Sequence, residues 1–364
     1  MAAQRALGEC AWGFVLRSGC RPFCHSQGRA APPSAQEVVE KIRAQKREQQ
    51  KKEEAEEETA KDTVSRRVQE LARLTGRLQQ VHPNVLAKAL KQGVLYQDKK
   101  IVVINKPYGI PVHGGPKVNR CLIDVLPVLA KMLDGMKAEP LHLCHRLDKE
   151  TTGVMVLARD QDTAHQIQEL FKARKVEKKY WAICIGNPEP AEGLIDIPIV
   201  EKEVESHQSH FKMTLAPNYR VSLEDGNIFK VRRHRDAHLA ATRYQTLSSS
   251  SSCSLLELQP VTGVKHQLRV HLAYGLGCPI LGDHKYSHWN KLAPQKLPEG
   301  TLKRLGLKQT KARHLPLCLH ACQLIIPKSD GSEENKIHVV CKPPAFFTRT
   351  LKRLKLERPE LGKM

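Results

Sequence analysis

Residues 143–160 read LCHRLDKETTGVMVLARD, and this stretch decides how the sequence around it is interpreted. Residues 153–158 form an apolar run rich in Val, which is too short for a helix and is typical of a buried strand. A helical pattern follows from Asp160 onward. Residues 145–152 are therefore predicted to form a polar loop in front of a core strand, where rigid scaffolds commonly mount catalytic groups.

The loop carries Asp148 between two cations, Arg146 and Lys149. Neighbouring cations favour the charged form of a carboxyl group, so we expect Asp148 to stay ionised. A plainer interpretation is an Asp that caps a turn and is flanked by two solvated cations. Periodicity alone does not separate these two interpretations.

The segment HRLDKETTGVMVLAR, residues 145–159, resembles the signature loop and strand of the RluA-type pseudouridine synthases, in which the Asp is the catalytic residue. In this sequence that residue is Asp148. The sequence is similar, within this family, to the mitochondrial members of the RNA pseudouridylate synthase domain-containing group. Four further segments agree with the family in order and spacing over about residues 95–345: IVVINKPYGIPVHGG, KVEKKYWAICIG, VTGVKHQLRVHLAYGLGCPILGDHKY and LCLHACQLIIP.

The resemblance implies an α+β architecture, the pseudouridine synthase fold, with a long mixed and largely antiparallel sheet and flanking helices around a basic active-site cleft. It also implies an isomerase that breaks the N-glycosidic bond of a uridine in RNA, turns the uracil and rejoins it through carbon. This reaction needs no external reactant. The sequence agrees, because it has no Gly-rich phosphate loop after a strand, no metal-ligand cluster and no dinucleotide fingerprint. We therefore expect an enzyme without cofactor or metal.

The resemblance assigns catalytic roles to Asp148, Tyr180 and Arg269. Asp148 is expected to act as a nucleophile at the sugar or as a base at C2′, and the resemblance leaves this choice open. Arg269 is expected to hold that carboxylate in a bidentate, charge-assisted pair. Tyr180 is expected to stack on the uracil, with its hydroxyl available for a proton.

RNA contacts are predicted for the same loop and for the segment around residue 266. A stacked uridine has to be flipped out before it can react, and the resemblance places Arg146 in the gap that it leaves. The alternative for Arg146 is a salt bridge to Glu150 or Asp148. The other residues predicted to bind RNA are His145, Lys149, Lys265 and His266.

The segment after residue 262 departs from the family at one position. Val264 stands where many relatives carry Arg, and Lys265 is expected to compensate for the missing cation. His266 and His271 are five residues apart, so on a helix they would not share the face that a metal-binding pair needs. Histidines with satisfied hydrogen bonds are the expected interpretation.

The charge of the chain points to a polyanionic partner. The 364 residues carry a formal charge of +21, and residues 76–364 hold +18 of it. A basic folded domain is the usual electrostatic sign of nucleic-acid binding, although a soluble basic enzyme remains the alternative. The sequence contains no run of about 18 apolar residues that a membrane-spanning helix would need, so we expect no membrane insertion.

Composition divides the chain into four predicted parts. Residues 1–36 carry scattered Arg and Ser with a single acid, which favours a mitochondrial transit peptide over an untargeted disordered tail. Residues 37–80 are a charged arm, helical or disordered. The predicted catalytic domain covers residues 81–348, and residues 349–364 form a basic tail.

Several elements of the catalytic domain are predicted from pattern alone. We expect a helix over 84–92 closed by Gly93, a strand over 100–105 and a hairpin whose loop is the Ser run 248–252. Residues 201–236 are interpreted as an insertion that lies on RNA or forms a surface loop. The eight Cys after residue 36 have no zinc-ribbon spacing and are expected to be reduced and buried.

The predicted function is pseudouridine formation in mitochondrial RNA within the matrix, with ribosomal RNA first and transfer or messenger RNA as alternatives. Proteins of ribosome assembly or of RNA granules are the expected protein partners. A catalytically idle RNA-binding or ribosome-assembly factor with the same fold is the alternative, because the basic charge of the domain supports both.

Overall fold

The computed structural model describes residues 40, 43–50, 66, 69–70, 73, 80–115, 120–204, 210–221, 228–231, 234–327 and 336–358. The predicted transit peptide lies outside these residues. The chain divides into two compact units, Met1–Glu58 and Thr59–Met364. Residues 43–50 of the first unit are helical, as one of the two interpretations of the arm expects. The second unit contains the predicted catalytic domain.

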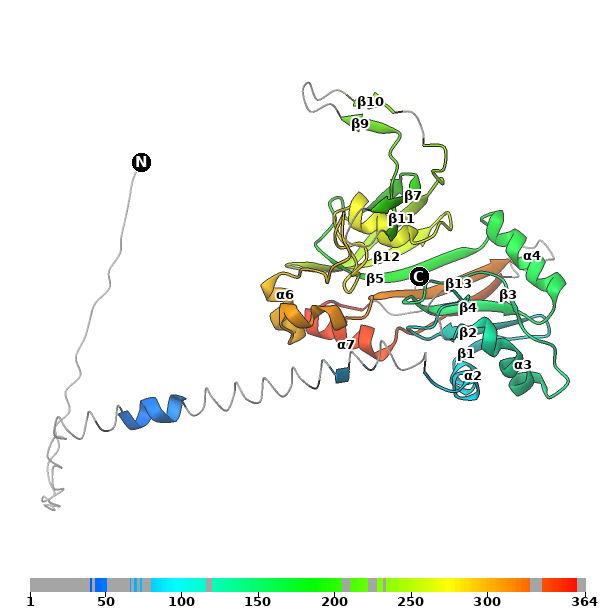
Figure 1. Cartoon of the computed structure of the whole chain (residues 1–364), viewed down its shortest axis with the longest axis horizontal. Coiled ribbons are helices and arrows are strands. Elements are labelled where there is room, and N and C mark those ends of the chain that lie inside the picture. Colours follow the sequence, from blue (N-terminus) through cyan, green and yellow to red (C-terminus); the bar gives the residue numbers. More distant parts are fainter. Residues whose placement is uncertain are drawn as a thin grey trace, which may run out of the picture. The chain divides into compact units, whose positions relative to one another are not determined.

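A ten-stranded sheet organises the second unit (Figure 1). All strand pairs in it are antiparallel except β4 with β13, which confirms the expected mixed, largely antiparallel α+β architecture. β3 (His142–Leu143) pairs with β4 and β14 (Lys336–Val340) pairs with β13 at its margins. The main path runs through β1 (Val94–Gln97), β2 (Ile101–Lys106), β4 (Thr152–Ala158), β13 (Leu319–Pro327), β5 (Glu177–Ile185), β12 (Cys253–Pro260), β11 (Ala241–Ser250) and β6 (Glu192–Asp196).

Helices cover both faces of this sheet. The α-helices are α2 (Pro83–Gln92), α3 (Leu126–Asp134), α4 (Gln161–Lys172), α5 (Gln267–Val270), α6 (Glu299–Leu305) and α7 (Ala345–Leu354). The other helical turns are η2 (Ile123–Val125), η3 (His271–Gly275) and η4 (Gln309–His314). The helix expected over 84–92 is α2, with Pro83 as its first residue and Gly93 as its C-cap. The expected N-terminal start of the next helix is also confirmed, because the Asp160 carboxylate accepts the Thr163 amide at 2.7 Å and caps α4.

Strand β4 is buried along its whole length, which explains its continuous apolar sequence. Met155 and Leu157 pack into a core shared with α2 and α3, whereas Val154 and Val156 face a second core beneath α4. The run therefore alternates between two cores rather than between core and solvent. This arrangement fixes the strand that the Asp148 loop enters.

Gly153 brings three strands together at the end of that loop. Ala321 on β13 pairs with Gly153 on β4 and with Tyr180 on β5. Gly153 has φ 114°, and a Cβ atom at this position would overlap the Ala321 carbonyl. Only glycine tolerates both this positive φ angle and this close approach to β13. Gly153 on β4 and Tyr180 on β5 lie on either side of Ala321, so Tyr180 is two strands away from the strand that follows the Asp148 loop.

The Ser-rich hairpin and the insertion differ in detail from expectation. Ser248 to Ser250 belong to β11, so only Ser251 and Ser252 form the turn before β12, because Ser248–Ser250 continue the antiparallel pairing. The segment interpreted as an insertion contains two hairpins, β7 (Ile199–Val204) with β8 (His210–Leu215) and β9 (Tyr219–Val221) with β10 (Ile228–Lys230). Strand β8 contacts α5, which carries Arg269.

Two expectations about the chain as a whole concern its cysteines and the membrane. The eight Cys after residue 36 are all buried free thiols, as expected: Cys121, Cys144, Cys184, Cys253, Cys278, Cys318, Cys322 and Cys341. Within the described ranges, none of the helices combines the length and the apolar character needed to cross a bilayer.

Candidate active site

The loop that carries Asp148 rests on a buried lysine. The Lys106 side chain has no exposed surface, and its ammonium donates hydrogen bonds to the carbonyls of Pro107, Lys149 and Thr151 at 2.9 to 3.1 Å. Burial lowers the pKa of Lys106 to about 7, while the charges of Asp148 and Glu150 act in the opposite direction. Lys106 was not predicted as a site residue, although it ends the strand that the sequence indicated.

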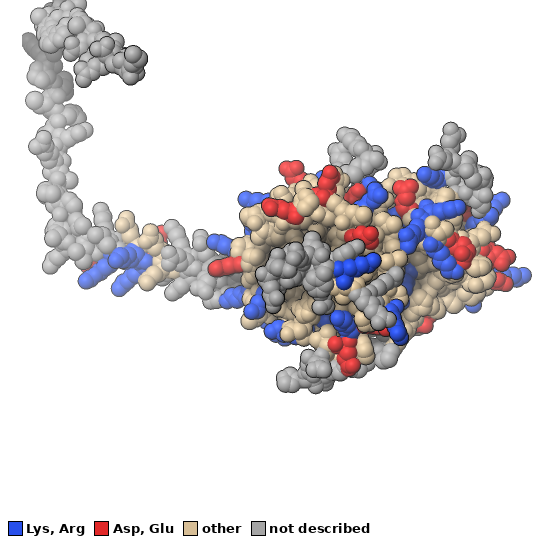
Figure 2. Space-filling model, turned by 90° about the horizontal axis from the view of Figure 1, so that it is seen from above, with Lys and Arg blue, Asp and Glu red and all other residues tan. Residues whose placement is uncertain are grey.

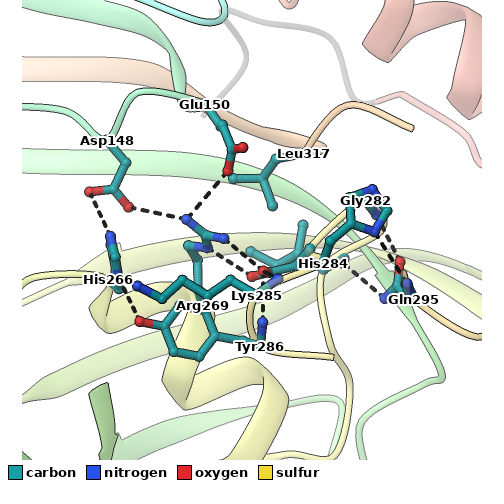
Figure 3. Close-up of polar contacts among 12 residues, drawn as sticks. Asp148, Glu150, His266, Arg269, Gly282, His284, Lys285, Tyr286, Gln295 and Leu317 are labelled. Carbon is teal, nitrogen blue, oxygen red and sulfur yellow. Dashed lines mark hydrogen bonds and ion pairs between the residues drawn. The ribbon is translucent and has the colours of Figure 1, made fainter. Parts of the chain in front are cut away.

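Arg269 lies at the centre of the site, but its bidentate partner differs from the expected one. Its Nε and Nη2 atoms donate to the two carboxylate oxygens of Asp283 at 2.8 and 2.7 Å (Figure 3). The remaining nitrogen, Nη1, lies 4.0 Å from Asp148 Oδ2 and 3.6 Å from Glu150 Oε2. The predicted bidentate pair of Arg269 with Asp148 is therefore wrong, because Asp283 occupies the edge of the guanidinium that such a pair needs. Arg269 faces Asp148 with a single nitrogen.

Asp283 holds this arginine from a turn of its own. Its carboxylate is fully buried and also accepts the amides of Lys285 and Tyr286 at 3.1 and 3.0 Å. The Tyr286 ring lies beneath the guanidinium, 5.1 Å from the Arg269 Cζ atom. The charge of Asp283 raises the pKa of Arg269 against the opposing effect of burial. The sequence signal that could have found Asp283 is the Gly-Asp pair in LGDHKY, which is typical of a turn.

Gly282 gives the turn its shape. Its φ is 82°, and a Cβ atom there would overlap the carbonyl of Pro316. Its amide donates to the side chain of Gln295 at 2.8 Å. A larger residue at 282 would displace the backbone that positions Asp283.

His266 is brought next to Asp148. Its Nε2 atom lies 4.0 Å from Asp148 Oδ1, and its Nδ1 atom lies 2.5 Å from the Tyr286 hydroxyl (Figure 3). Burial lowers the pKa of His266 to about 2, and the positive charges of Arg269 and Lys285 add to the effect. The imidazole is therefore neutral at physiological pH.

Asp148 itself is only partly exposed, with 20% of its side-chain surface accessible. Burial raises its pKa above the usual value, and this effect outweighs the opposing charges of Arg269, Arg146 and Lys106. We had expected the neighbouring cations to dominate, so the direction of the shift is a correction. It arises because a carboxylate in a partly dry site loses solvation that cations several ångströms away do not fully replace.

Tyr180 projects from β5 toward the same site. Burial raises its pKa, and the nearby charge of Asp148 raises it further, so the phenol stays protonated. Among the residues that the structure describes, none forms a hydrogen bond with its hydroxyl. The phenol therefore has an unused donor close to Asp148.

The three cations predicted to bind RNA differ in their contacts. Arg146 and Lys149 are exposed on the loop, and in the described part of the chain no ion pair joins Arg146 to Asp148 or Glu150. The salt-bridge alternative for Arg146 therefore finds no support. Lys265 forms an ion pair with Glu201 at 2.8 Å, with both side chains about half exposed.

His145 points away from the loop surface. Its Nε2 atom accepts the Val156 amide at 3.0 Å, and its ring stacks on Phe171 of α4 with 4.6 Å between centroids. Burial lowers its pKa to about 3. Since the ring and Nε2 are both engaged inside the fold, this geometry does not support the prediction that His145 binds RNA.

A metal site was not expected, and the described residues contain no group of three or more His, Cys, Asp or Glu that could hold an ion. His271 is buried and bonds to the Thr242 hydroxyl and the Ile197 carbonyl, each at 2.9 Å. It is thus a hydrogen-bonded core histidine, as the plainer interpretation expected.

A separate groove of about 1060 Å³ lies between α2, α7 and described arm residues such as Arg73. Its lining reaches Lys106 and Thr152, at the base of the Asp148 loop, but does not include the three predicted catalytic residues. We therefore assign the chemistry to the cluster around Arg269 and not to this groove.

Comparisons with known proteins identify the family. The family described as RNA pseudouridylate synthase matches residues 100–274. The chain is 62% identical to human "Pseudouridylate synthase RPUSD4, mitochondrial" over 99% of its own length and 96% of that protein. It is 30% identical to mouse "Mitochondrial mRNA pseudouridine synthase Rpusd3" over 75% of its length and 80% of that protein. These names support the mitochondrial location predicted from the leader.

A solved structure supports the same assignment. The chain matches "Human RNA Pseudouridylate Synthase Domain Containing 4" with a TM-score of 0.68 and 62% identity, covering 76% of this chain and 98% of that one. The resemblance to the mitochondrial members of the RNA pseudouridylate synthase domain-containing group is thereby confirmed. The chain belongs to the RNA pseudouridylate synthase family and is a pseudouridylate synthase, an isomerase.

Proposed function

We propose that this chain converts specific uridines of mitochondrial RNA to pseudouridine with Asp148 as the catalytic residue. One observation carries the proposal: the partly buried Asp148 carboxylate accepts no hydrogen bond from any residue that the structure describes, although Arg269 and His266 lie 4.0 Å away. Buried carboxylates are normally satisfied by donors. An unsatisfied one in a polar cluster is available for a substrate.

The surroundings of Asp148 support a direct chemical role. The carboxylate would act as a nucleophile at C1′ of the ribose or as a base at C2′, and both routes need it ionised and close to the sugar. Burial raises the pKa of Asp148, which makes its anion a stronger base and nucleophile than an exposed aspartate. Arg269 presents one nitrogen to this anion while Asp283 holds the rest of the guanidinium in place.

Tyr180 is proposed to bind the uracil. Its ring, carried by β5, offers an apolar face, and its raised pKa keeps the hydroxyl proton in place at neutral pH. The phenol would stack on the base while it turns and would donate to an oxygen of the uracil. This role is supported by the strand pairing, in which Tyr180 on β5 and Gly153 on β4 both pair with Ala321 of β13, and by the effect of the Asp148 charge on the pKa of Tyr180.

The exposed cations of the loop are proposed to bind the RNA around the target. Arg146 would stack in the space that the flipped uridine leaves, since its guanidinium is exposed and planar. Lys149 would contact phosphate, and Lys265 would do so in competition with Glu201. Figure 2 shows Lys and Arg spread over one face of the molecule and interspersed with Asp and Glu, so phosphate contacts are distributed.

Ribosomal RNA is the proposed first target, with transfer and messenger RNA as further classes; the name of the mouse relative Rpusd3 supports the messenger class. The proposed compartment is the mitochondrial matrix, reached through a transit peptide in residues 1–36. Residues 37–80 would then form an arm before the catalytic domain, residues 81–348. The predicted basic tail, residues 349–364, begins inside α7, whose Leu351 and Leu354 pack in the core, so only its exposed cations would bind phosphate. Ribosome-assembly and RNA-granule proteins are the proposed protein partners.

The test is a map of pseudouridine in mitochondrial RNA treated with the full chain, read by carbodiimide adduct stops. We expect new pseudouridines with the wild type and none with Asp148→Ala. Asp162→Ala, on the exposed first turn of α4, is the matched control and should act like the wild type. Activity that survives Asp148→Ala would refute the assignment, and RNA binding without any modification by the wild type would favour the binding factor instead.

A further inference from the structure

The two carboxylate oxygens of Asp148 face different groups at the same distance. Oδ1 lies 4.0 Å from His266 Nε2, and Oδ2 lies 4.0 Å from Arg269 Nη1 (Figure 3). Both separations exceed a hydrogen bond, whose donor and acceptor are about 2.7–3.2 Å apart. A small polar group therefore fits between Oδ1 and the histidine and would satisfy both.

Tyr286 and Asp148 together favour one tautomer of His266. The Met213 amide donates to the Tyr286 hydroxyl oxygen at 3.4 Å, and we assign the hydroxyl proton to the bond with His266 Nδ1, because Nε2 faces the Asp148 carboxylate and is the better place for the imidazole hydrogen. An imidazole that accepts at Nδ1 carries its hydrogen on Nε2. The Nε2–H group is then directed at Asp148, an arrangement that the negative charge of the carboxylate favours.

The neutral state of His266 keeps the gap open. Burial and the neighbouring cations lower its pKa to about 2, so His266 does not form a charged pair with Asp148. A cationic imidazole would be drawn onto the carboxylate and would compete with its chemistry. His266 also has φ 56°, a left-handed conformation that non-glycine residues adopt at a cost and that often marks functional positions.

We propose that His266 selects ribose, with the 2′-hydroxyl of the target nucleotide held between its Nε2–H group and Asp148 Oδ1. This proposal rests on the proposed role of Asp148. A hydroxyl both donates and accepts, so it can donate to the carboxylate and accept from the imidazole. An oxygen about 2.8 Å from each of two atoms 4.0 Å apart would see them at roughly 90°, an angle open to a hydroxyl.

The chemistry of the reaction points to this hydroxyl rather than to another one. The bond that breaks ends at C1′ of the ribose, and the carboxylate has to reach C1′ or C2′. The 2′-hydroxyl is attached to C2′ and is therefore the hydroxyl closest to Asp148 in either route. Arg269 Nη1 faces the other carboxylate oxygen of Asp148, Oδ2, and stays available to stabilise charge that develops during the reaction.

The proposal is tested with two variants of His266 in the full chain. His266→Asn keeps a residue that tolerates the left-handed conformation and a polar atom for Tyr286, but lacks any group at the Nε2 position. His266→Gln carries an amide N–H near that position. His165→Asn is the control, because His165 is exposed on α4 and its nearest acid is Glu169 at 3.9 Å.

The substrates are a short synthetic RNA centred on a uridine that the wild type converts in the mapping experiment, and the same RNA with 2′-deoxyuridine at that position. We expect the wild type to prefer the ribose substrate in kcat/KM by at least about tenfold, the value of one well-placed hydrogen bond or more. His266→Asn should lower this preference by about tenfold, because it lowers kcat/KM for the ribose substrate and leaves kcat/KM for the 2′-deoxyuridine substrate unchanged. His266→Gln should retain most of it.

The ratio of the two preferences is the decisive number. The intrinsic difference in reactivity between the two sugars is the same for every variant and cancels in that ratio. Equal losses on both substrates would overturn the proposal and leave His266 a structural residue. If the wild type converts no uridine in the mapping experiment, the proposed function fails before this test begins, so the two failures are distinguishable.

A variant at Tyr286 covers the case in which His266→Asn does not fold. Tyr286→Phe removes the hydroxyl that sets the imidazole tautomer but keeps the ring beneath Arg269. We expect it to lower the ribose preference by a smaller factor, on the order of threefold. An unchanged preference in this variant would overturn the proposed tautomer and with it the proposed contact.

Discussion

The two sides of Arg269 are built differently. On one side, Asp283 is fully buried and accepts four hydrogen bonds, from the Arg269 side chain and from two amides of its own turn. On the other side, Asp148 and Glu150 are partly exposed and lie 4.0 and 3.6 Å from the same guanidinium. The same residue thus links a satisfied aspartate to an unsatisfied one.

The two sides of Arg269 differ in how completely their carboxylates are hydrogen-bonded. The buried side positions Arg269 and gains rigidity from complete pairing. On the open side the described contacts of the two carboxylates are longer than hydrogen bonds, which costs stability but leaves the carboxylates available for substrate. The predictions below test this division by disturbing first the supporting side and then the open one.

The largest effect on stability is expected from Asp283→Ala. The substitution leaves the buried Arg269 charge without its partner and should lower the free energy of unfolding by about 3–5 kcal/mol. Chemical denaturation of the full chain measures this change, and Asp162→Ala, with an exposed carboxylate, should change stability by less than about 1 kcal/mol. A small effect at Asp283 would show that the support does not depend on this pair.

Gly153→Ala should disturb the strand contact that sets Tyr180 against the loop. The new Cβ atom would overlap the Ala321 carbonyl at a φ of 114°, so we expect a loss of about 1–3 kcal/mol in stability and a lower kcat. Gly115→Ala is the matched control, because no atom lies within 4 Å of a Cβ there. Equal stability of the two variants would contradict the proposed role of the close approach.

The elements that could be predicted from the sequence are those with local signals. Pattern and capping residues predicted α2, α4, β2 and β4, since their apolar periodicity and the Asp160 cap lie within a short stretch of chain. The sheet order, in contrast, brings Gly153 beside Ala321, and nothing in either local sequence records that pairing. Only the resemblance to a family supplied the architecture.

The candidate site shows the same limit. Lys106 and Asp283 were missed because their importance comes from contacts with residues 14 or more positions away. His145 was predicted to bind RNA, whereas the loop turns its ring toward Phe171, which the sequence does not indicate. Sequence identified which residue types the site contains; their partners required the structure.

Lys106 supports the Asp148 loop on the open side, and its titration makes the stability of the chain depend on pH. Its pKa is lowered to about 7 in the folded chain, so between about pH 7 and 10 the unfolded chain binds more protons than the folded one. The stability of the wild type relative to Lys106→Met should therefore rise with pH over this window. Urea denaturation of both proteins at about pH 7 and 9 measures it. A difference that is the same at both pH values would contradict the lowered pKa and show that Lys106 stays fully charged on its three carbonyls.

The smallest effects are expected at the outer rim of the open side. Lys149→Ala should weaken RNA binding and reduce the slope of log affinity against log salt by about one, as the loss of one phosphate contact does. Lys265→Ala should reduce the slope by less, because its ammonium already pairs with Glu201 at 2.8 Å. Salt titrations of binding to mitochondrial RNA measure both, and a larger effect at Lys265 would contradict this ranking.

The most direct test of the central claim compares stability and catalysis in Asp148→Asn. The claim is that Asp148 is kept free for chemistry, so this variant should fold at least as stably as the wild type while its single-turnover rate falls on the order of a thousandfold or more. The rate is measured on a uridine that the wild type converts, and stability by chemical denaturation. An Asp148→Asn variant that loses stability as Asp283→Ala does, yet keeps its rate, would contradict the account.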